Sequence, residues 1–220
     1  MTSLLVFSHL RWAGAFQRPQ QLMSRLAAAH PILFIEEPVV GAERTWLERY
    51  SHCAGVQVLR VHVPGNAPGF AEMHMDRMRL LLGQYLEDHG IDQYLLWFCT
   101  PMALPLAQDL APLGSIYDCM DERSALDGAP PALLAREALL LGQVDLVFAD
   151  GPSLYESQRA RHRDVHCFAS SVDQAVAATS WDLTAGAMHA LLERLEAPAA
   201  AAPLPVWALP PQRTPSLPLA

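Results

Sequence analysis

Seven short apolar runs recur along the first 173 residues, and stretches with helical spacing separate them. The runs lack the regular alternation of polar residues that marks a half-exposed strand. They lie at residues 4–7, 32–35, 56–63, 94–99, 114–117, 144–148 and 165–168. The succession of apolar runs and helical stretches predicts an α/β fold with a mostly parallel sheet covered on both faces. Right-handed crossovers then give a doubly wound, Rossmann-like domain over residues 1–173.

The segments between these runs differ in how clearly they predict structure. Residues 41–55 are the least defined, and Trp46, Leu47 and Tyr50 allow a short helix there. Other helices are marked by apolar residues three and four apart and by prolines suited to a first helical turn. We expect helices that begin near Pro19 and after Thr100, and others over residues 70–89, 132–141 and 153–161.

The chain changes character after residue 173. Ser180 can cap a helix in which four apolar residues form one stripe, namely Leu183, Ala187, Leu191 and Leu195. This helix is too short to be stable alone in water, so we expect it to pack on the preceding domain with Trp181 near the contact. Dense prolines after it predict a disordered tail. The predicted parts are a domain over 1–173, a linker and C-terminal helix over 174–197, and a tail over 198–220.

Composition excludes several classes of function. A formal net charge of −8 argues against nonspecific nucleic-acid binding. No apolar run reaches the roughly 18 residues that a transmembrane helix needs, and the N-terminus does not resemble a signal peptide. No glycine-rich dinucleotide fingerprint follows the first run, and no Walker A motif is present, so we expect no bound nucleotide cofactor.

The four cysteines stand alone, without a C-x-x-C pair or a histidine at metal spacing. They are Cys53, Cys99, Cys119 and Cys167. We therefore expect no metal site, and a reducing cytoplasm fits best. Cys119 lies in an acidic segment whose carboxylates would raise the pKa of a thiol, so it does not read as a nucleophile.

Polar residues follow three of the apolar runs at the point where each run ends. These are the segments 8–12, 36–38 and 118–122. In an open α/β sheet, ligands bind at the carboxyl ends of the strands. The pattern predicts a polar binding cleft at that edge. The alternative is that these residues are acidic helix caps and solvated loops.

Five segments together resemble the N-terminal domain of bacterial GT-B glycosyltransferases of the group-1 type. They are residues 7–12 (FSHLRW), 17–20 (QRPQ), 35–38 (IEEP), 117–122 (YDCMDE), and 151–155 (GPSLY) through 170–173 (SSVD). The resemblance implies two Rossmann-like domains facing a cleft, of which the N-terminal one mainly holds the acceptor. The other domain mainly holds the nucleotide-sugar donor. The segment from Ser180 is similar to the family's C-terminal helix, which crosses back onto the first domain.

We therefore expect an acceptor-side domain whose donor domain is missing, with negligible transfer by this chain alone. In full-length relatives the partners are a nucleotide-sugar donor and a glycan or lipid-linked acceptor of envelope or exopolysaccharide synthesis. The location implied is cytoplasmic or peripheral at the inner membrane. The alternative function is a non-catalytic binding or regulatory module that pairs with a separate chain supplying a donor domain.

The resemblance implies roles for particular residues. A carboxylate or histidine that removes a proton from the acceptor hydroxyl would be Asp118, Asp121 or His9. Substrate-binding candidates are Arg11, Arg18, Gln17, Glu37, Glu122, Ser153 and Ser171.

Structural roles are the open alternative for several of these residues. Arg11 and Arg18 can form ion pairs with Glu36, Glu37 or the acidic segment. Asp118 can bind loop amides, and His9 can be a structural histidine. Ser153 can belong to an ordinary helix start.

Overall fold

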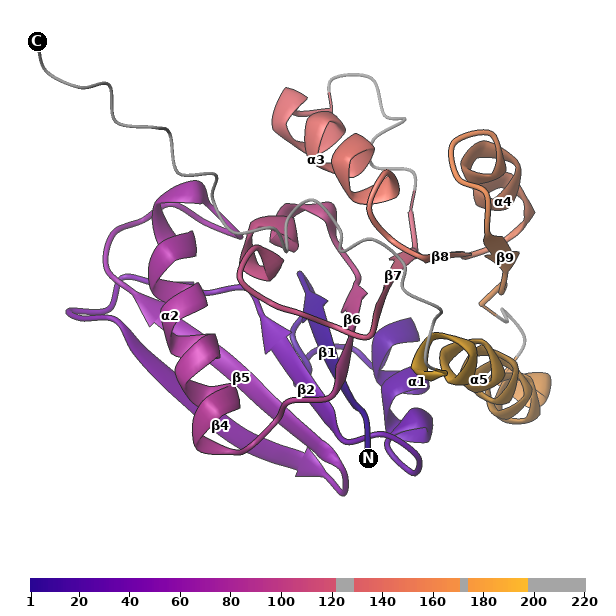
Figure 1. Ribbon diagram of the computed structural model, residues 1–220, viewed down its shortest axis with the longest axis horizontal. Helices are drawn as coiled ribbons and strands as arrows, with labels where there is room; N and C mark the ends of the chain where they lie inside the picture. Colours follow the sequence, from indigo (N-terminus) through magenta and orange to yellow (C-terminus); the bar gives the residue numbers. More distant parts are fainter. Residues whose placement is uncertain (122–128, 171–173, 198–220) are drawn as a thin grey trace, which may run out of the picture.

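The computed structural model describes residues 1–121, 129–170 and 174–197. Within these residues it is an α/β structure built on one nine-stranded sheet (Figure 1). The strands are β1 (Ser3–Ser8), β2 (Ile32–Glu36), β3 (Val39–Val40), β4 (Trp46–Cys53), β5 (Val56–Val63), β6 (Tyr94–Phe98), β7 (Gly114–Cys119), β8 (Leu146–Ala149) and β9 (Val165–Cys167). The helices are α1 (Arg18–Leu26), α2 (Glu72–Asp88), the 3-10 helix η1 (Pro101–Ala107), α3 (Pro131–Leu141), α4 (Pro152–Arg159) and α5 (Gln174–Glu196).

The strand order is β3-β5-β2-β1-β6-β7-β8-β9, with β4 added beside β5. Every pairing along this order is parallel, and only the β4–β5 pairing is antiparallel. The chain builds outward from β1 on one side and then returns to add β6 on the other. The doubly wound parallel fold is therefore confirmed, and its switch point lies between β1 and β6.

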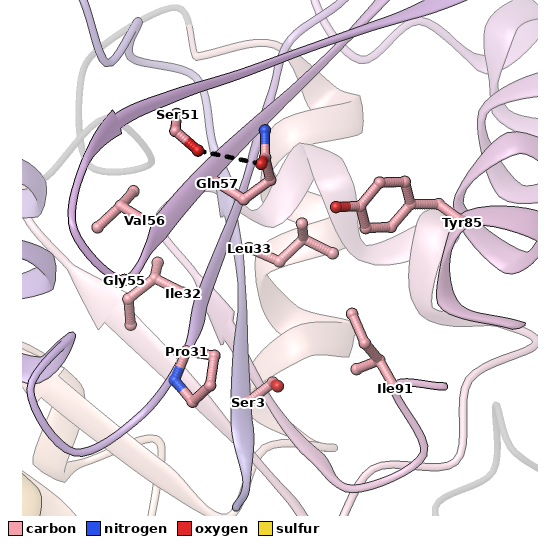
Figure 2. Close-up of a pocket in the computed structure, with 10 residues that line it drawn as sticks. All are labelled: Ser3, Pro31, Ile32, Leu33, Ser51, Gly55, Val56, Gln57, Tyr85 and Ile91. Atoms are coloured by element: carbon pink, nitrogen blue, oxygen red, sulfur yellow. Dashed lines mark hydrogen bonds between the residues drawn. The ribbon is translucent and has the colours of Figure 1, made fainter. Parts of the chain in front are cut away.

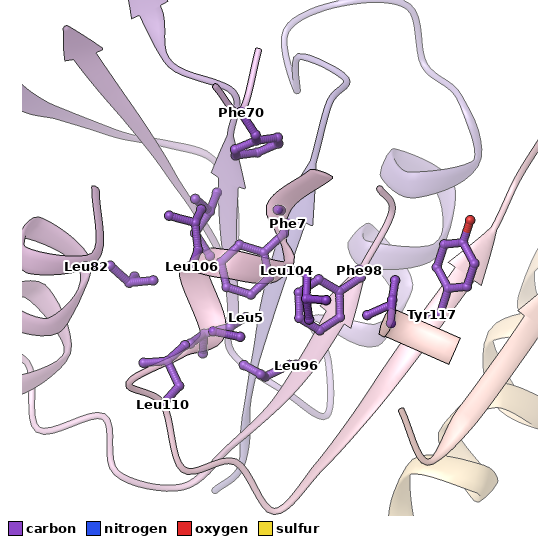
Figure 3. Packing of buried hydrophobic residues seen from close by; sticks show 14 of the residues in the cluster. Leu5, Phe7, Phe70, Leu82, Leu96, Phe98, Leu104, Leu106, Leu110 and Tyr117 are labelled. Atoms are coloured by element: carbon purple, nitrogen blue, oxygen red, sulfur yellow. The ribbon is translucent and has the colours of Figure 1, made fainter. Parts of the chain in front are cut away.

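Helices cover both faces of the sheet with apolar side chains. On one face, residues of α2, η1, α3 and α4 pack against alternate residues of the strands, and Phe7 stacks on Phe98 with ring centroids 5.1 Å apart (Figure 3). On the other face, α1 and α5 lie over Val6, Phe34 and Trp97. The central strands are buried on both faces, which is why they read as continuous apolar runs.

The segment 41–55 departs from its prediction. Residues 46–53 form β4, an edge strand, in place of the short helix that the sequence allows. Ala54 and Gly55 make a two-residue connection to β5, and Gly55 adopts a left-handed φ of 78°. This φ suits a tight hairpin turn. Pairing with β5 therefore makes residues 46–53 a strand, although their sequence pattern is weak.

The acidic segment also differs from its prediction, because β7 continues through Asp118 and Cys119. These two residues are therefore buried strand residues and do not belong to a loop. Glu122, Ser171 and the predicted tail over 198–220 lie outside the described residues.

Helix α5 packs on the domain, as expected, but with a different face from the predicted stripe. Trp181, Ala185, Met188 and Leu192 are buried in the cluster that includes α1. Leu183 is 70% exposed and Ala187 is also exposed, whereas Leu191 and Leu195 are partly buried. The sequence fixes only the spacing of the apolar residues along the helix, and packing against α1 and the sheet selects which of them are buried.

Close contact at the sheet also supports this placement of α5. A Cβ atom added to Gly114 at the start of β7 would lie 3.0 Å from Cβ of Leu195. The absent side chain therefore gives α5 room to approach the sheet. Among the described helices, none combines the length and the apolar character required to cross a bilayer.

We predict that Met188→Ala lowers the free energy of unfolding by about 2–5 kcal/mol, because it opens a cavity under a docked helix. The matched control is Leu183→Ala on the exposed face, which should change it by about 0.5 kcal/mol or less. Urea unfolding with amide hydrogen exchange over α5 measures both variants. Equal, small effects would contradict the docking of α5.

Candidate functional site

The carboxyl ends of the parallel strands meet at one edge of the sheet, where the sequence places its polar segments. β1 ends at Ser8, β2 at Glu36 and β7 at Cys119, while Asp150 follows β8. Two groups of charged side chains form at this edge, one around Arg18 and one around Glu36. Both are built from residues far apart in the sequence.

Arg18, at the start of α1, is the centre of the first group. Its Nε donates to Oδ1 of Asp118 at 3.0 Å, and its Nη2 lies 2.9 Å from the same oxygen. Its Nη1 donates to the carbonyl oxygen of Phe168 at 2.6 Å and lies 3.6 Å from Oδ1 of Asp150. Asp150 also accepts hydrogen bonds from the backbone N–H and the hydroxyl of Ser170. Arg18 thus ties α1 to β7 and to the segments after β8 and β9.

Burial governs the electrostatics of this group. Asp118 is fully buried, and this burial raises the pKa of its carboxyl above the ordinary value although Arg18 opposes the shift. Burial alone would lower the pKa of Arg18, but Asp118 and Asp150 outweigh it and raise that pKa. The guanidinium therefore stays charged, and its ion pairs hold the carboxylates in place.

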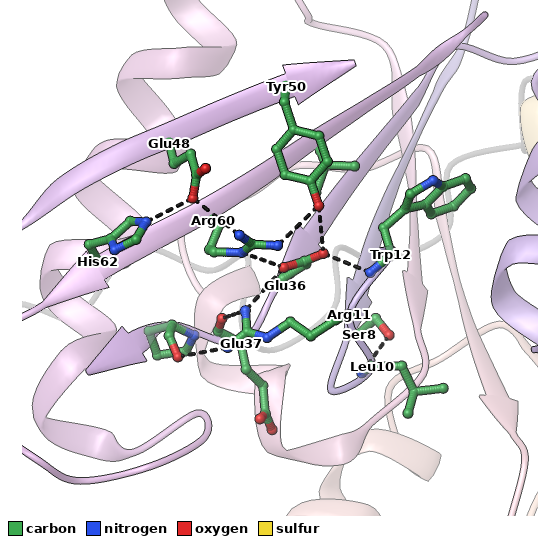
Figure 4. A network of polar contacts seen from close by, with 12 residues as sticks. Ser8, Leu10, Arg11, Trp12, Glu36, Glu37, Glu48, Tyr50, Arg60 and His62 are labelled. Atoms are coloured by element: carbon green, nitrogen blue, oxygen red, sulfur yellow. Dashed lines mark hydrogen bonds and ion pairs between the residues drawn. The ribbon is translucent and has the colours of Figure 1, made fainter. Parts of the chain in front are cut away.

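Glu36 is the centre of the second group, and its side chain is also fully buried (Figure 4). It accepts hydrogen bonds from Nε of Arg60 at 2.7 Å, from the backbone N–H of Trp12 at 2.7 Å and from Arg11 at 3.0 Å. The hydroxyl of Tyr50 donates to it at 3.2 Å. Burial alone would raise the pKa of Glu36, but the hydrogen bonds from Arg60, Trp12 and Arg11 outweigh it and hold that pKa below its ordinary value.

The structure gives both candidate arginines the ion pairs that the sequence left open as an alternative. Arg11 binds Glu36 and the carbonyl oxygens of Glu37 and Pro38, and it shapes the loop after β1. Arg18 is buried with Asp118. Asp118 therefore faces Arg18 inside the protein and has no exposed surface for a substrate, so the structure favours a structural role over that of a base.

The other predicted site residues lie along the same edge with more exposure. Gln17 and Asp121 are exposed, and His9 and Glu37 are partly buried. Ser153 is an exposed residue in the first turn of α4. These side chains, unlike Asp118 and Arg18, are accessible to a ligand. Their catalytic and binding roles stay predictions.

The Cys119 thiol is a poor nucleophile, as predicted, but for a different physical reason. Burial in β7, more than the neighbouring carboxylates, raises the pKa of its thiol to about 12. A thiol with this pKa is protonated at neutral pH and is a poor nucleophile. Within the described residues, no group of three or more His, Cys, Asp or Glu side chains is arranged to hold a metal ion.

A cavity lies at the opposite, amino-terminal edge of the sheet (Figure 2). Its lining includes Ser3, Gln57 and Tyr85, and its volume is about 260 Å³. Ligand pockets usually start near roughly 300 Å³. Its size and its place away from the strand ends give no support for a binding function there.

The sequence reasoning missed three residues that organise the edge. Gln20 donates from Nε2 to the carbonyl oxygen of Arg11 and fixes the loop between β1 and α1. Asp150 had a signal, because it directly follows an apolar run, as Asp118 does. Arg60 had a weaker signal. It is a polar residue between Leu59 and Val61, inside a run that was predicted to be a strand from its valines alone.

Comparisons with known proteins define the fold. No family model matches the chain, and no curated protein matches it. The structure resembles a sucrose-phosphate synthase chain from Thermosynechococcus elongatus, with 12% identity and a TM-score of 0.57. That match covers 89% of this chain and 100% of the other.

Two larger structures match as well. Sucrose-phosphate synthase from Thermosynechococcus elongatus matches with 11% identity and a TM-score of 0.59, over 80% of this chain and 50% of that one. Trehalose-6-phosphate synthase from E. coli, bound with UDP-2-fluoro glucose, matches with 11% identity and a TM-score of 0.50, over 76% of this chain and 48% of that one. The chain thus spans about half the length of these two neighbours. It has the fold of a single Rossmann-like half of a GT-B glycosyltransferase.

We predict that Glu36→Gln lowers the free energy of unfolding by about 3–5 kcal/mol, because Arg60 and Arg11 lose their buried charged partner. The lowered pKa of Glu36 means that the unfolded chain binds this proton more readily than the folded chain. The stability from Glu36 is therefore fully present above the unfolded pKa of about 4.3 and is lost as pH falls through the folded pKa.

Urea unfolding of Glu36→Gln between pH 6 and pH 3 should accordingly show a shallower acid-side loss than the unmodified chain. The control is Glu48→Gln, whose side chain is 34% exposed, with an expected cost below about 1 kcal/mol. Equal effects of the two substitutions on the free energy of unfolding would contradict the claim that the buried Glu36 holds this group of charges together.

A second prediction concerns the pair of Arg18 and Asp118. Arg18→Met should cost about 3–5 kcal/mol, because it leaves the buried carboxylate without its partner. Adding Asp118→Leu should recover most of this loss, since apolar residues often replace a buried ion pair at little cost. Thermal or urea unfolding of the single and double variants measures the coupling. Additive losses in the double variant would refute the pairing.

Proposed function

We propose that this chain is the acceptor-side domain of a GT-B-type glycosyltransferase and holds a sugar acceptor at the carboxyl edge of its sheet. One observation carries the proposal. The structure matches the whole of a sucrose-phosphate synthase chain over 89% of its own length. In this chain, helix α5 returns to pack beside α1 on the sheet.

The chemistry of the edge supports this assignment. The switch point between β1 and β6 is where open α/β sheets bind ligands. The loop after β1 presents His9 and Gln17 there, and Asp121 follows β7. A partly buried histidine and an exposed carboxylate can accept a proton from an acceptor hydroxyl, and amide groups can position that hydroxyl. Arg18 and Asp118 would serve by holding α1 and β7 in register beneath these side chains.

A second reactant has to be held elsewhere, because transfer requires donor and acceptor in one geometry. The described residues comprise a single Rossmann-like domain. We propose that the donor is a nucleotide sugar bound by a second domain, and that the acceptor is a glycan or lipid-linked sugar. A setting on the cytoplasmic side of envelope or exopolysaccharide synthesis follows from the family resemblance.

We predict no measurable glycosyl transfer when the purified chain is incubated with UDP-glucose and a set of sugars and sugar phosphates. The same acceptors should instead bind and shift amide resonances near residues 8–11, 17 and 150–153. His9→Ala and Gln17→Ala should each weaken this binding by about tenfold, equivalent to roughly 1.4 kcal/mol. Both residues retain solvent exposure, so the fold should persist.

Residues of the cavity at the amino edge, such as Gln57 and Tyr85, supply the internal control and should not shift. Sustained turnover by the chain alone would refute the proposal that the donor is bound by a second domain. Binding confined to the amino edge would refute the assignment of the acceptor site.

A further inference from the structure

The hairpin of β4 and β5 carries an aromatic and polar surface that the proposed function does not use. Trp46 on the edge strand β4 lies directly opposite His62 on β5, and Glu48 lies opposite Arg60. Because side chains two residues apart share one face of a strand, these four project from the same face of the hairpin. We call this surface, formed by Trp46, Glu48, Arg60 and His62, the Trp46 platform.

The indole of Trp46 is held in place but remains open to solvent. The ring of His62 stacks on it with centroids 4.1 Å apart and an angle of 9° between the planes. Nε2 of His62 in turn lies 2.8 Å from Oε2 of Glu48, which fixes the orientation of the imidazole. Trp46 is nevertheless 43% exposed. A rigid aromatic ring covered on one face by another ring offers its remaining surface to a ligand at low entropic cost.

The charges beside the indole neutralise one another. Arg60 contacts both Glu36 and Glu48, and Arg11 contacts Glu36, so two guanidinium groups face two carboxylates. The hydroxyl of Tyr50 accepts from Arg60 and donates to Glu36, and this contact closes the network (Figure 4). Such a surface has hydrogen-bonding groups without net charge. It therefore suits a neutral polar ligand better than a phosphate or a carboxylate.

Protection of an edge strand does not explain the platform. Charged side chains alone suffice to block pairing with another strand, whereas an exposed tryptophan adds an apolar surface that favours association. A pyranose ring has the complementary surface, with an apolar C–H face to stack on an indole and hydroxyls around its rim. Glu48 lies two residues from Trp46 on the same face of β4, and Arg60 lies opposite Glu48, so their polar groups lie beside the indole.

The platform also adjoins the proposed acceptor edge. β5 runs parallel to β2, so His62 lies near the carboxyl end of the sheet. Glu36 joins Arg60 of the platform to Arg11 and to the N–H of Trp12 in the loop after β1. A glycan reaching from the loop after β1 toward β4 would therefore cross this surface.

We propose that the Trp46 platform binds a pyranose ring of a neutral glycan, stacked on the indole and hydrogen-bonded to Glu48 and Arg60. The inference deepens the proposed function, on which it rests, by assigning a second sugar subsite to the acceptor. It identifies the acceptor as an oligosaccharide or a longer glycan, with one sugar at the loop after β1 and another on the platform.

The test uses the full chain, with its tryptophans labelled with ¹⁵N, and a panel of neutral tetrasaccharides of glucose, galactose and mannose in α and β linkages. We expect at least one of them to shift the indole N–H resonance of Trp46. Trp46→Ala should weaken that binding by about tenfold or more, as expected from the loss of a stacking side chain. Trp46→Tyr, which keeps an aromatic face, should retain most of the affinity.

The matched control is Arg49→Ala, on the same strand but the opposite face, which should leave affinity unchanged. No shift of the Trp46 resonance with any tetrasaccharide, or unchanged affinity in Trp46→Ala, would overturn the proposal that the platform binds a glycan. A shift of Trp46 by uridine monophosphate but not by the sugars would overturn the assignment of ligand class. Shifts at residues 8–11 without a shift of Trp46 would overturn the platform proposal and leave the proposed function standing. A shift of Trp46 without shifts at residues 8–11 would overturn the acceptor site at the loop after β1, and with it the assignment of the platform as a second subsite.

Discussion

Both faces of the central sheet are apolar, and the rest of the structure depends on covering them. β1, β2, β6, β7 and β8 have no polar face to present to water. Helices α2, η1, α3 and α4 cover one face, and α1 shares the other with α5. Trp97 and Phe148 in the middle of the sheet belong to the cluster that Met188 and Leu192 of α5 complete. The returning helix is thus part of the core of the domain.

Charged residues inside the protein have a second structural function, which is to fix the loops at the carboxyl edge. Glu36 joins the end of β2 to the loop after β1, and Arg18 joins α1 to β7. An unpaired buried charge is costly, so each of these groups is stable only when all its partners are in place. This dependence makes the edge rigid, and it separates residues that build the site, such as Asp118, from exposed ones that can meet a ligand, such as Gln17.

The hairpin of β4 and β5 widens the sheet beyond its parallel strands. It brings Trp46 and His62 next to each other and places them beside the network of Glu36. In this chain, the parallel strands position the loops of the switch point, and the antiparallel strand β4 adds surface beside β5 at the edge of the sheet. The hairpin therefore enlarges the surface at this edge of the sheet.

The sequence by itself determined the parallel α/β fold, because unbroken apolar runs such as residues 4–7 and 94–99 are stable only between two layers of helices. It also placed the polar segments at one edge, since parallel strands share one direction. Only the tertiary structure decided that Arg18 pairs with Asp118, that Ala185 and Met188 join Trp181 at the contact of α5, and that residues 46–53 form a strand. These outcomes depend on partners distant in the sequence, whose positions no local pattern contains.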